Sequence, residues 1–218
     1  MSRTTLCGIF AVFCLPLLLL VAACEKRETV TQTTENGFRE EFQVNKKTGD
    51  RDGYYKKFRP DGSLIQECTY RNGKLDGKLR LYYASGKRMQ EETYRDDVLE
   101  GTVYAWYESG GLEAEENYVN SQHEGPIVRY YENGKVYKTL TMKNGVEDGP
   151  VKIYWPNGNL QEEGEFHVGI VPLSGMSNER LAEKWHGERK MYDENGQHIR
   201  TLSCEYSICR VTWQRDSQ

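Results

Sequence analysis

Residues 77–101 read GKLRLYYASGKRMQEETYRDDVLEG, and this stretch decides the fold. Residues 78–83 and 87–94 have the composition of two β-strands, and the Ala-Ser-Gly between them has that of a turn. A glycine, an aromatic residue five positions later and a second glycine nine positions later recur in six copies. Their opening glycines are 24 residues apart until the last, which is displaced by 38. The copies are Gly53–Phe58–Gly62, Gly77–Tyr82–Gly86, Gly101–Trp106–Gly110, Gly125–Tyr130–Gly134, Gly149–Tyr154–Gly158 and Gly187–Tyr192–Gly196. A fixed period of this length predicts one elongated repeat domain, in which each repeat packs mainly on its neighbours.

The residues around the second glycine of each copy predict a β-hairpin. Pairs such as Asp61-Gly62 and Asn133-Gly134 are strong hairpin signals, because glycine adopts a positive φ without steric cost. Apolar residues often stand two and four positions after the opening glycine, so the aromatic residue at position five should point to the opposite face of the sheet. We therefore predict an all-β fold, an elongated single-layer antiparallel ribbon of about six 24-residue hairpin repeats.

The two ends and one insertion depart from the repeat. Residues 37–218 form the predicted repeat domain, in which residues 38–45 are the return strand of a degraded first copy and residues 204–218 cap the last edge. The insertion spans residues 167–186, and we expect Ser177 to cap a short helix over residues 179–185. Leu181 and Trp185 are four residues apart, which is the spacing of a helix packed on the sheet; alternatively, the insertion carries the function.

The first 23 residues have the pattern of an export signal. Arg3 is their only charged residue and an uncharged apolar run follows from Leu6 to Ala23, although a membrane anchor of minimal length has a similar pattern. Val21-Ala22-Ala23-Cys24 resembles the lipobox of bacterial lipoproteins, which implies that Cys24 is acylated, with palmitate among its chains. For a Gram-negative host, the same resemblance implies attachment to the outer membrane facing the periplasm, because residue 25 is Glu and not the Asp that tends to retain such lipoproteins at the inner membrane. Residues 24–36 are polar, and we predict that they form a disordered tether.

The repeat resembles the MORN-repeat variant common in exported bacterial proteins, over roughly residues 35–204. The resemblance rests on the Gly-x4-aromatic-x3-Gly pattern and the recurring Asn-Gly or Asp-Gly turns. It implies a single-layer antiparallel ribbon used for binding or scaffolding, with no catalytic residues to carry over. Some bacterial relatives carry an antitoxin label, but the export signal disfavours a cytoplasmic antitoxin role for this chain.

The candidate binding surface is the aromatic row, which could stack on sugars, anchor a partner protein or simply cover the second face of a thin sheet. The row consists of Phe58, Tyr82, Trp106, Tyr130, Tyr154 and Tyr192. A second row occupies one position of the return strands, where we expect it to face water: Glu67, Glu91, Glu115 and Glu163. A third row precedes the opening glycines and should form a solvated acidic edge: Asp52, Asp76, Glu100, Glu124 and Asp148.

Other site chemistries have little support in the sequence. The four histidines lack the spacing of a metal motif, although His167 and His186 could meet at the base of the insertion, and we expect no metal and no cofactor. Cys204 and Cys209 are close enough in sequence for a local disulfide, whereas Cys68 is expected to be a buried free thiol. The formal net charge of −4 and the lack of a basic block exclude a nucleic-acid footprint.

These observations predict a non-enzymatic, lipid-anchored protein of a bacterial cell envelope that presents a β-repeat surface to a protein partner. The alternative is a module that binds peptidoglycan or another glycan through the aromatic row. No nucleophile elbow, phosphate loop or nucleotide fingerprint supports an enzyme.

Overall fold

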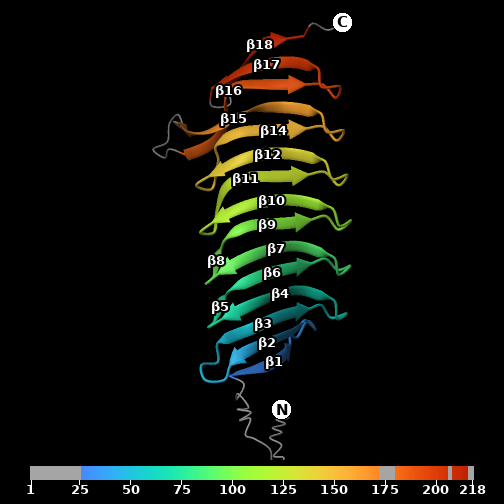
Figure 1. Cartoon of the computed structure of the whole chain (residues 1–218), viewed down its shortest axis with the longest axis vertical. Helices are drawn as coiled ribbons and strands as arrows, with labels where there is room; N and C mark the ends of the chain where they lie inside the picture. Colours follow the sequence, from blue (N-terminus) through green and yellow to red (C-terminus); the bar gives the residue numbers. More distant parts are fainter. Residues whose placement is uncertain (1–25, 172–179, 206–207, 216–218) are drawn as a thin grey trace, which may run out of the picture.

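A computed structural model describes residues 26–171, 180–205 and 208–215, which form one sheet of 18 strands and no helix (Figure 1). The long strands pair antiparallel in chain order, and the two-residue strands β5, β8 and β13 pair with β4, β7 and β12, which also pair with β6, β9 and β14. Strands β1 and β18 therefore lie at opposite ends of a long ribbon (Figure 1). The strands are β1 (Arg27–Thr33), β2 (Arg39–Asn45), β3 (Arg51–Phe58), β4 (Leu64–Arg71), β5 (Lys74–Leu75), β6 (Gly77–Tyr82), β7 (Arg88–Arg95), β8 (Val98–Leu99), β9 (Gly101–Trp106), β10 (Leu112–Val119), β11 (Gln122–Tyr130), β12 (Val136–Lys143), β13 (Val146–Glu147), β14 (Gly149–Tyr154), β15 (Leu160–Val171), β16 (Arg180–Tyr192), β17 (His198–Glu205) and β18 (Ile208–Gln214). The predicted all-β antiparallel ribbon of six hairpin repeats is confirmed.

The predicted turns lie at one edge of the ribbon. In the first, the Gly62 N–H donates to the Arg59 carbonyl at 2.9 Å, and the Arg59 N–H donates to the Ser63 carbonyl at 2.8 Å. Gly62 has a φ of 86°, which suits a type I turn followed by a left-handed glycine. The same bonds close the other five repeats, so the second glycine of each copy ends its turn.

Buried hydrophobic residues lie on one face of the sheet, which we call the core face, and include Tyr55, Cys68, Val103, Ala114, Ile127, Leu140, Met142 and Val151. Near the N-terminal end, Phe42, Tyr55 and Cys68 form one cluster. A second cluster farther along the ribbon consists of Ile127, Leu140, Met142 and Val151. The opposite face carries the aromatic row, as side-chain alternation requires, and we call it the aromatic face.

The predicted tether is wrong over Arg27–Thr33, which form β1. This segment pairs with β2 through seven residues, from Arg27 opposite Asn45 to Thr33 opposite Arg39. Its backbone completes hydrogen bonds that β2 would otherwise leave open, and Val30 packs on the Phe42 cluster. The sequence signal was weak because one partly buried valine among polar residues suffices for an edge strand.

The predicted helix over residues 179–185 is also wrong, because β16 already begins at Arg180. Strands β15 and β16 extend the hairpin past its neighbours to the pair Val171–Arg180 (Figure 1). Trp185 lies opposite Phe166 with ring centroids 4.5 Å apart, and both rings pack on the second core cluster. A spacing of four residues places two side chains on the same face in a strand as well as in a helix, so the pattern did not discriminate.

Candidate functional site

The aromatic row follows the long axis of the ribbon. Its members are the last residues of β3, β6, β9, β11, β14 and β16, directly before the turns, and each side chain is partly buried. The period of the sequence therefore becomes a row of rings on one face. This arrangement could contact an extended partner, provided that the rings keep fixed orientations.

Carboxylates from the preceding return strands fix three of the tyrosines. The hydroxyl of Tyr82 donates to Glu67 at 2.6 Å, that of Tyr130 to Glu115 at 2.7 Å, and that of Tyr192 to Glu163 at 2.8 Å. Three of the four glutamates predicted to face water thus hold tyrosines of the aromatic row instead. Tyr82 follows Glu67 by 15 residues, and Tyr130 follows Glu115 by the same number. The sequence therefore carried a signal for these pairs that the prediction missed.

These contacts keep the tyrosines protonated. Burial and the bond to a carboxylate raise the pKa of Tyr82 to about 12, and burial with the Glu163 bond does the same for Tyr192. At Tyr130 the bond to Glu115 is the main cause of a pKa of about 12. In turn, the Tyr82 hydroxyl is the main cause that lowers the pKa of Glu67. The pair of Tyr82 and Glu67 therefore joins a neutral donor to an ionised acceptor over the physiological range.

Glu91 has a different environment, because the ring at the corresponding position is Trp106. Its carboxylate receives Lys78 at 2.5 Å, Arg80 at 2.8 Å and Arg88 at 3.2 Å, and the whole residue is only 8% exposed. Burial opposes its ionisation, but the bonds from Lys78 and Arg80 outweigh burial and lower the pKa of Glu91. Arg88 also lies over the Trp106 ring, 5.2 Å from its centroid, which restricts the orientation of the indole.

A second set of bonds links each repeat to the next. The Tyr83 hydroxyl donates to the Trp106 carbonyl at 2.7 Å, and the Tyr107 hydroxyl donates to the Tyr130 carbonyl at 2.6 Å. The other members of this ladder follow the same rule: Arg59 to the Tyr82 carbonyl, Tyr131 to the Tyr154 carbonyl and Trp155 to the Tyr192 carbonyl. The residue after each row member therefore fixes the backbone of the next row member. The prediction from the sequence missed this ladder.

The centre of the aromatic face differs from its N-terminal part. On β6, Lys78 and Arg80 accompany Tyr82, whereas the corresponding positions of β9 and β11 hold no charged residue. We call these positions the central aromatic patch: Thr102, Tyr104, Trp106, Pro126, Val128 and Tyr130. The rings of Tyr104 and Trp106 stack with centroids 6.0 Å apart. Glu115 of β10 lies between the two strands, opposite Tyr104 and Val128, so the patch combines ring and apolar contacts with one carboxylate that Tyr130 binds.

The acidic residues before the opening glycines have structural partners. Asp52 binds Arg27, Asp76 binds Arg71 and Asp148 binds His167. Glu100 and Glu124 accept the backbone N–H groups of the turns at Asn120 and Asn144. Their role is therefore to support turns and strand ends.

The histidines do not assemble a metal site within the described residues. His167 lies between Asp148 at 3.0 Å and Glu165 at 3.1 Å, and its ring is 5.3 Å from that of His186, so the two histidines meet as predicted. A hydroxyl–imidazole pair, Thr201 and His198 at 2.8 Å, is covered: Thr201 is 6% exposed and Trp213 stacks on the imidazole ring. This pair lacks the access that a nucleophile needs.

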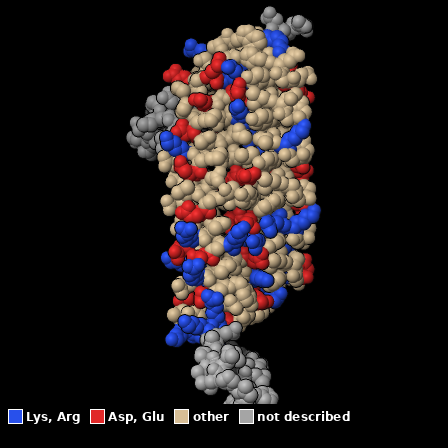
Figure 2. Space-filling view, viewed as in Figure 1, with Lys and Arg blue, Asp and Glu red and all other residues tan. Residues whose placement is uncertain are grey.

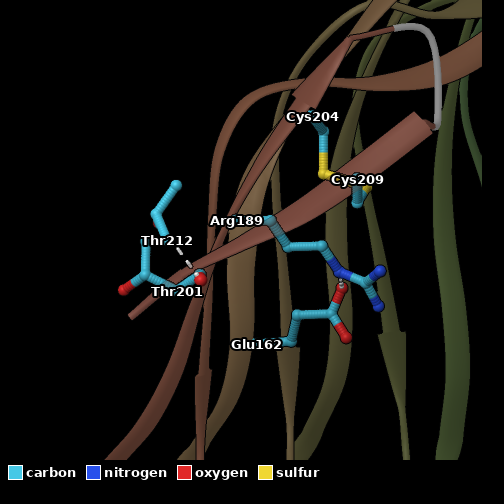
Figure 3. Close-up of a disulfide and its surroundings, with 6 residues drawn as sticks. All are labelled: Glu162, Arg189, Thr201, Cys204, Cys209 and Thr212. Atoms are coloured by element: carbon cyan, nitrogen blue, oxygen red, sulfur yellow. Dashed lines mark hydrogen bonds and ion pairs between the residues drawn. A yellow bond between two sulfur atoms is a disulfide. The ribbon is translucent and has the colours of Figure 1, made fainter. Parts of the chain in front are cut away.

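The cysteines fall into three groups. Cys204 and Cys209 form a disulfide that joins β17 to β18, close to the ion pair of Glu162 and Arg189 (Figure 3). Cys68 is a buried free thiol, and burial raises its pKa to about 11. The predicted lipidation site Cys24 and the predicted signal over residues 1–23 lie outside the described residues.

Comparison with known proteins assigns the fold to a family. Six segments match the MORN repeat variant, and together they cover more than half of the chain: residues 51–72, 75–96, 99–120, 124–144, 147–167 and 185–203. The chain therefore belongs to the MORN repeat variant family and is a repeat scaffold. The last match starts at residue 185, where the long β15–β16 hairpin rejoins the repeat frame.

The other comparisons add little. No curated protein matches the chain. A solved structure described as "Crystal Structure of TarM" is similar over 55% of this chain at 14% sequence identity and a TM-score of 0.30, and the match spans a fifth of that structure (20%). A similarity this low supports no argument. The described residues contain no helix with the length and apolar character needed to cross a membrane.

Proposed function

We propose that the chain is a non-enzymatic, lipid-anchored protein of a bacterial cell envelope, and that its aromatic face binds a protein partner. The observation that carries the proposal is the row of six rings, with carboxylate bonds that fix three of them and a ladder that fixes the backbone of five. Side chains held in place before binding lose less conformational entropy when a partner arrives. Tyr and Trp are also the residue types that contribute most at protein interfaces.

The central aromatic patch is the best position for the partner. Trp106 and Tyr104 present a stacked pair of rings on β9, and Pro126 and Val128 add apolar contacts on β11, on the other side of Glu115. On the face that Figure 2 shows, acidic and basic side chains are mixed along the ribbon, and this face has no continuous basic stripe of the kind that nucleic acid requires. A protein surface with apolar anchors fits this patch.

The proposed anchor rests on the sequence Val21-Ala22-Ala23-Cys24 and on the polar-to-apolar pattern before it. Acyl chains on Cys24 would hold the ribbon at a membrane, and Glu25 favours the outer membrane of a Gram-negative cell facing the periplasm. Replacement of Cys24 by Ala tests the anchor. The expected result is loss of the protein from the membrane fraction, and retention would contradict it.

Photo-crosslinking in intact cells tests the partner surface. A photoreactive amino acid replaces Trp106 on the aromatic face, and a matched control replaces Arg129, which is exposed on the opposite face. The expected result is a discrete adduct with the same protein in repeated experiments at position 106 and none at position 129. Equal adducts at both positions, or none at either in a protein exported normally, would contradict a protein-binding aromatic face.

Glycan binding is the alternative, because a stacked pair such as Tyr104 and Trp106 can also pack on a sugar ring. The test compares binding to isolated cell wall for the wild type, Trp106→Ala and Tyr130→Ala. Loss of binding in both variants would favour the glycan reading. Binding that is absent in the wild type, or unchanged in both variants, would exclude it.

A further inference from the structure

The ribbon begins much closer to the proposed lipid anchor than a tether would allow. Strand β1 starts at Arg27, three residues after Cys24, and three residues span at most about 10 Å. If Cys24 is acylated, as proposed above, the N-terminal end of the sheet lies at the bilayer surface. The side chains at this end would then meet the lipid headgroups.

Four cations are grouped at this end, and we call them the N-terminal basic cluster: Lys26, Arg27, Lys46 and Lys47. The Lys46 N–H donates to the Lys26 carbonyl at 2.9 Å, which places the loop after β2 beside the start of β1. All four residues are exposed. In Figure 2, basic side chains gather at the lower end of the ribbon, next to the grey N-terminal residues.

The four cations of the cluster differ in whether a carboxylate already pairs with them. Arg27 is held by Asp52 through two bonds of 2.8 and 3.2 Å, so it positions the start of β1. Within the described ranges, no ion pair joins Lys26, Lys46 or Lys47 to a carboxylate.

The surface at this end is hollowed. A shallow hollow of about 480 Å³ lies over the first three strands, and the lysines at positions 26 and 46 line it together with Arg27, Glu28, Thr29, Gln43 and Asp52. Hydroxyl and amide groups of the lining add hydrogen-bond partners for a phosphate. The lining also holds the carboxylates of Glu28 and Asp52, and Arg27 pairs with Asp52. The site therefore combines the ammonium groups of two lysines and polar donors with one carboxylate outside the Arg27–Asp52 pair.

We infer that the N-terminal basic cluster binds the anionic phospholipid headgroups around the anchor and fixes the ribbon on the membrane. The long axis of the sheet would then lead away from the bilayer. With strands about 4.8 Å apart, the central aromatic patch would stand on the order of 30 to 40 Å above the surface. The inference rests on the proposed lipid anchor and adds the orientation in which the scaffold meets its partner.

The test uses the acylated full chain in two kinds of vesicle, pure phosphatidylcholine and phosphatidylcholine with 30% phosphatidylglycerol. A spin label at Thr48→Cys reports distance from the bilayer, and a second label at Gln214→Cys reports the far end. Cys68 is buried and Cys204 is bonded to Cys209, so both labels react selectively. The charge variant is Lys46→Glu/Lys47→Glu, and the matched control is Lys143→Glu/Arg210→Glu, which changes the net charge equally at exposed positions elsewhere.

The expected result is that label 48 contacts headgroups more in vesicles with phosphatidylglycerol than in pure phosphatidylcholine, and that 0.5 M salt or Lys46→Glu/Lys47→Glu reduces the additional contact on the order of tenfold. Label 214 should stay in water throughout, and the control variant should behave as wild type. Equal contact in both kinds of vesicle, or equal loss in both charge variants, would overturn the inference while leaving the anchor intact. Vesicle flotation separates the two proposals, because a chain that does not float refutes the anchor and this inference together.

Discussion

The hydroxyl of Tyr107 donates a hydrogen bond of 2.6 Å to the carbonyl oxygen of Tyr130, which lies in the next repeat. The acceptor carbonyl belongs to a member of the aromatic row, so the bond links the stability of the array to the geometry of its candidate binding surface. Tyr83 and Tyr131 make the equivalent bonds on either side.

We predict that Tyr107→Phe lowers the free energy of unfolding by about 1 kcal/mol, because it removes this partly buried bond and leaves the carbonyl of Tyr130 without its donor. Urea denaturation followed by circular dichroism measures the change. Tyr137→Phe is the matched control, since Tyr137 is 38% exposed and its replacement should have little effect. Equal effects of the two variants would show that the ladder does not stabilise the array.

The loss of folding stability at alkaline pH should depend on the hydrogen-bonded pairs of tyrosine and glutamate on the aromatic face. The folded-state pKa of Tyr82, about 12, is above the value of about 10 in an unfolded chain. The raised pKa means that its stabilising effect is complete below pH 10 and is lost as the pH rises toward 12.

The absorbance difference at 295 nm between wild type and Tyr82→Phe isolates this phenolate across the titration. Glu67→Gln should move the Tyr82 transition to lower pH, because the charged acceptor is gone while burial remains. A Tyr82 transition near pH 10 in the wild type would contradict the role assigned to Glu67.

Glu91 should contribute to the loss of folding stability at acidic pH. Its pKa is lowered in the folded state, so its stabilising effect is present above about pH 4.3 and is lost as the pH falls further. We predict that Glu91→Gln lowers the free energy of unfolding by about 1 to 3 kcal/mol at pH 7, because three cations lose a charged acceptor. The difference from wild type should shrink toward pH 3, as measured by denaturation at each pH. Glu194→Gln, at an exposed turn, is the control, and a deficit independent of pH would argue against the ionic explanation.

The hairpin repeats could be predicted from the sequence because the interactions that define each hairpin are local in the chain. The glycine of each turn and the alternation around Tyr82 are determined within one hairpin, so a 24-residue period specifies them directly. The face of the sheet on which the aromatic row lies followed from the same alternation. This is why six hairpins and their common face could be predicted.

Interactions between repeats were harder to predict, because the two partners stand in different copies. The partner of Tyr107 is 23 residues away and is a carbonyl, which every residue has, so composition gives no signal. Strand β1 depends on the open edge of β2 rather than on its own hydrophobicity. The extension of β15 and β16 depends on Phe166 and Trp185 meeting across the sheet.

The contact of Trp185 with Gly164 leads to a last prediction about the insertion. A Cβ atom at Gly164 would lie 2.8 Å from Cζ3 of Trp185 and 3.1 Å from the carbonyl oxygen of Glu188. The indole cannot simply move outward, because it packs on Phe166 and on the guanidinium of Arg189, which lies 4.6 Å from the ring centroid.

We therefore predict that Gly164→Ala lowers the free energy of unfolding by roughly 1 to 3 kcal/mol through overpacking, and that it loosens the hairpin at the base of the insertion. Gly111→Ala is the matched control, because its nearest contact would be 3.6 Å from the carbonyl of Glu132 and neither glycine has a left-handed φ. Tryptophan fluorescence of the two variants during urea unfolding, together with amide exchange of β15 and β16, measures both effects. If Gly164→Ala is as stable as Gly111→Ala, the indole is not confined between Gly164 and Arg189. The insertion would then be held by pairing of its strands alone.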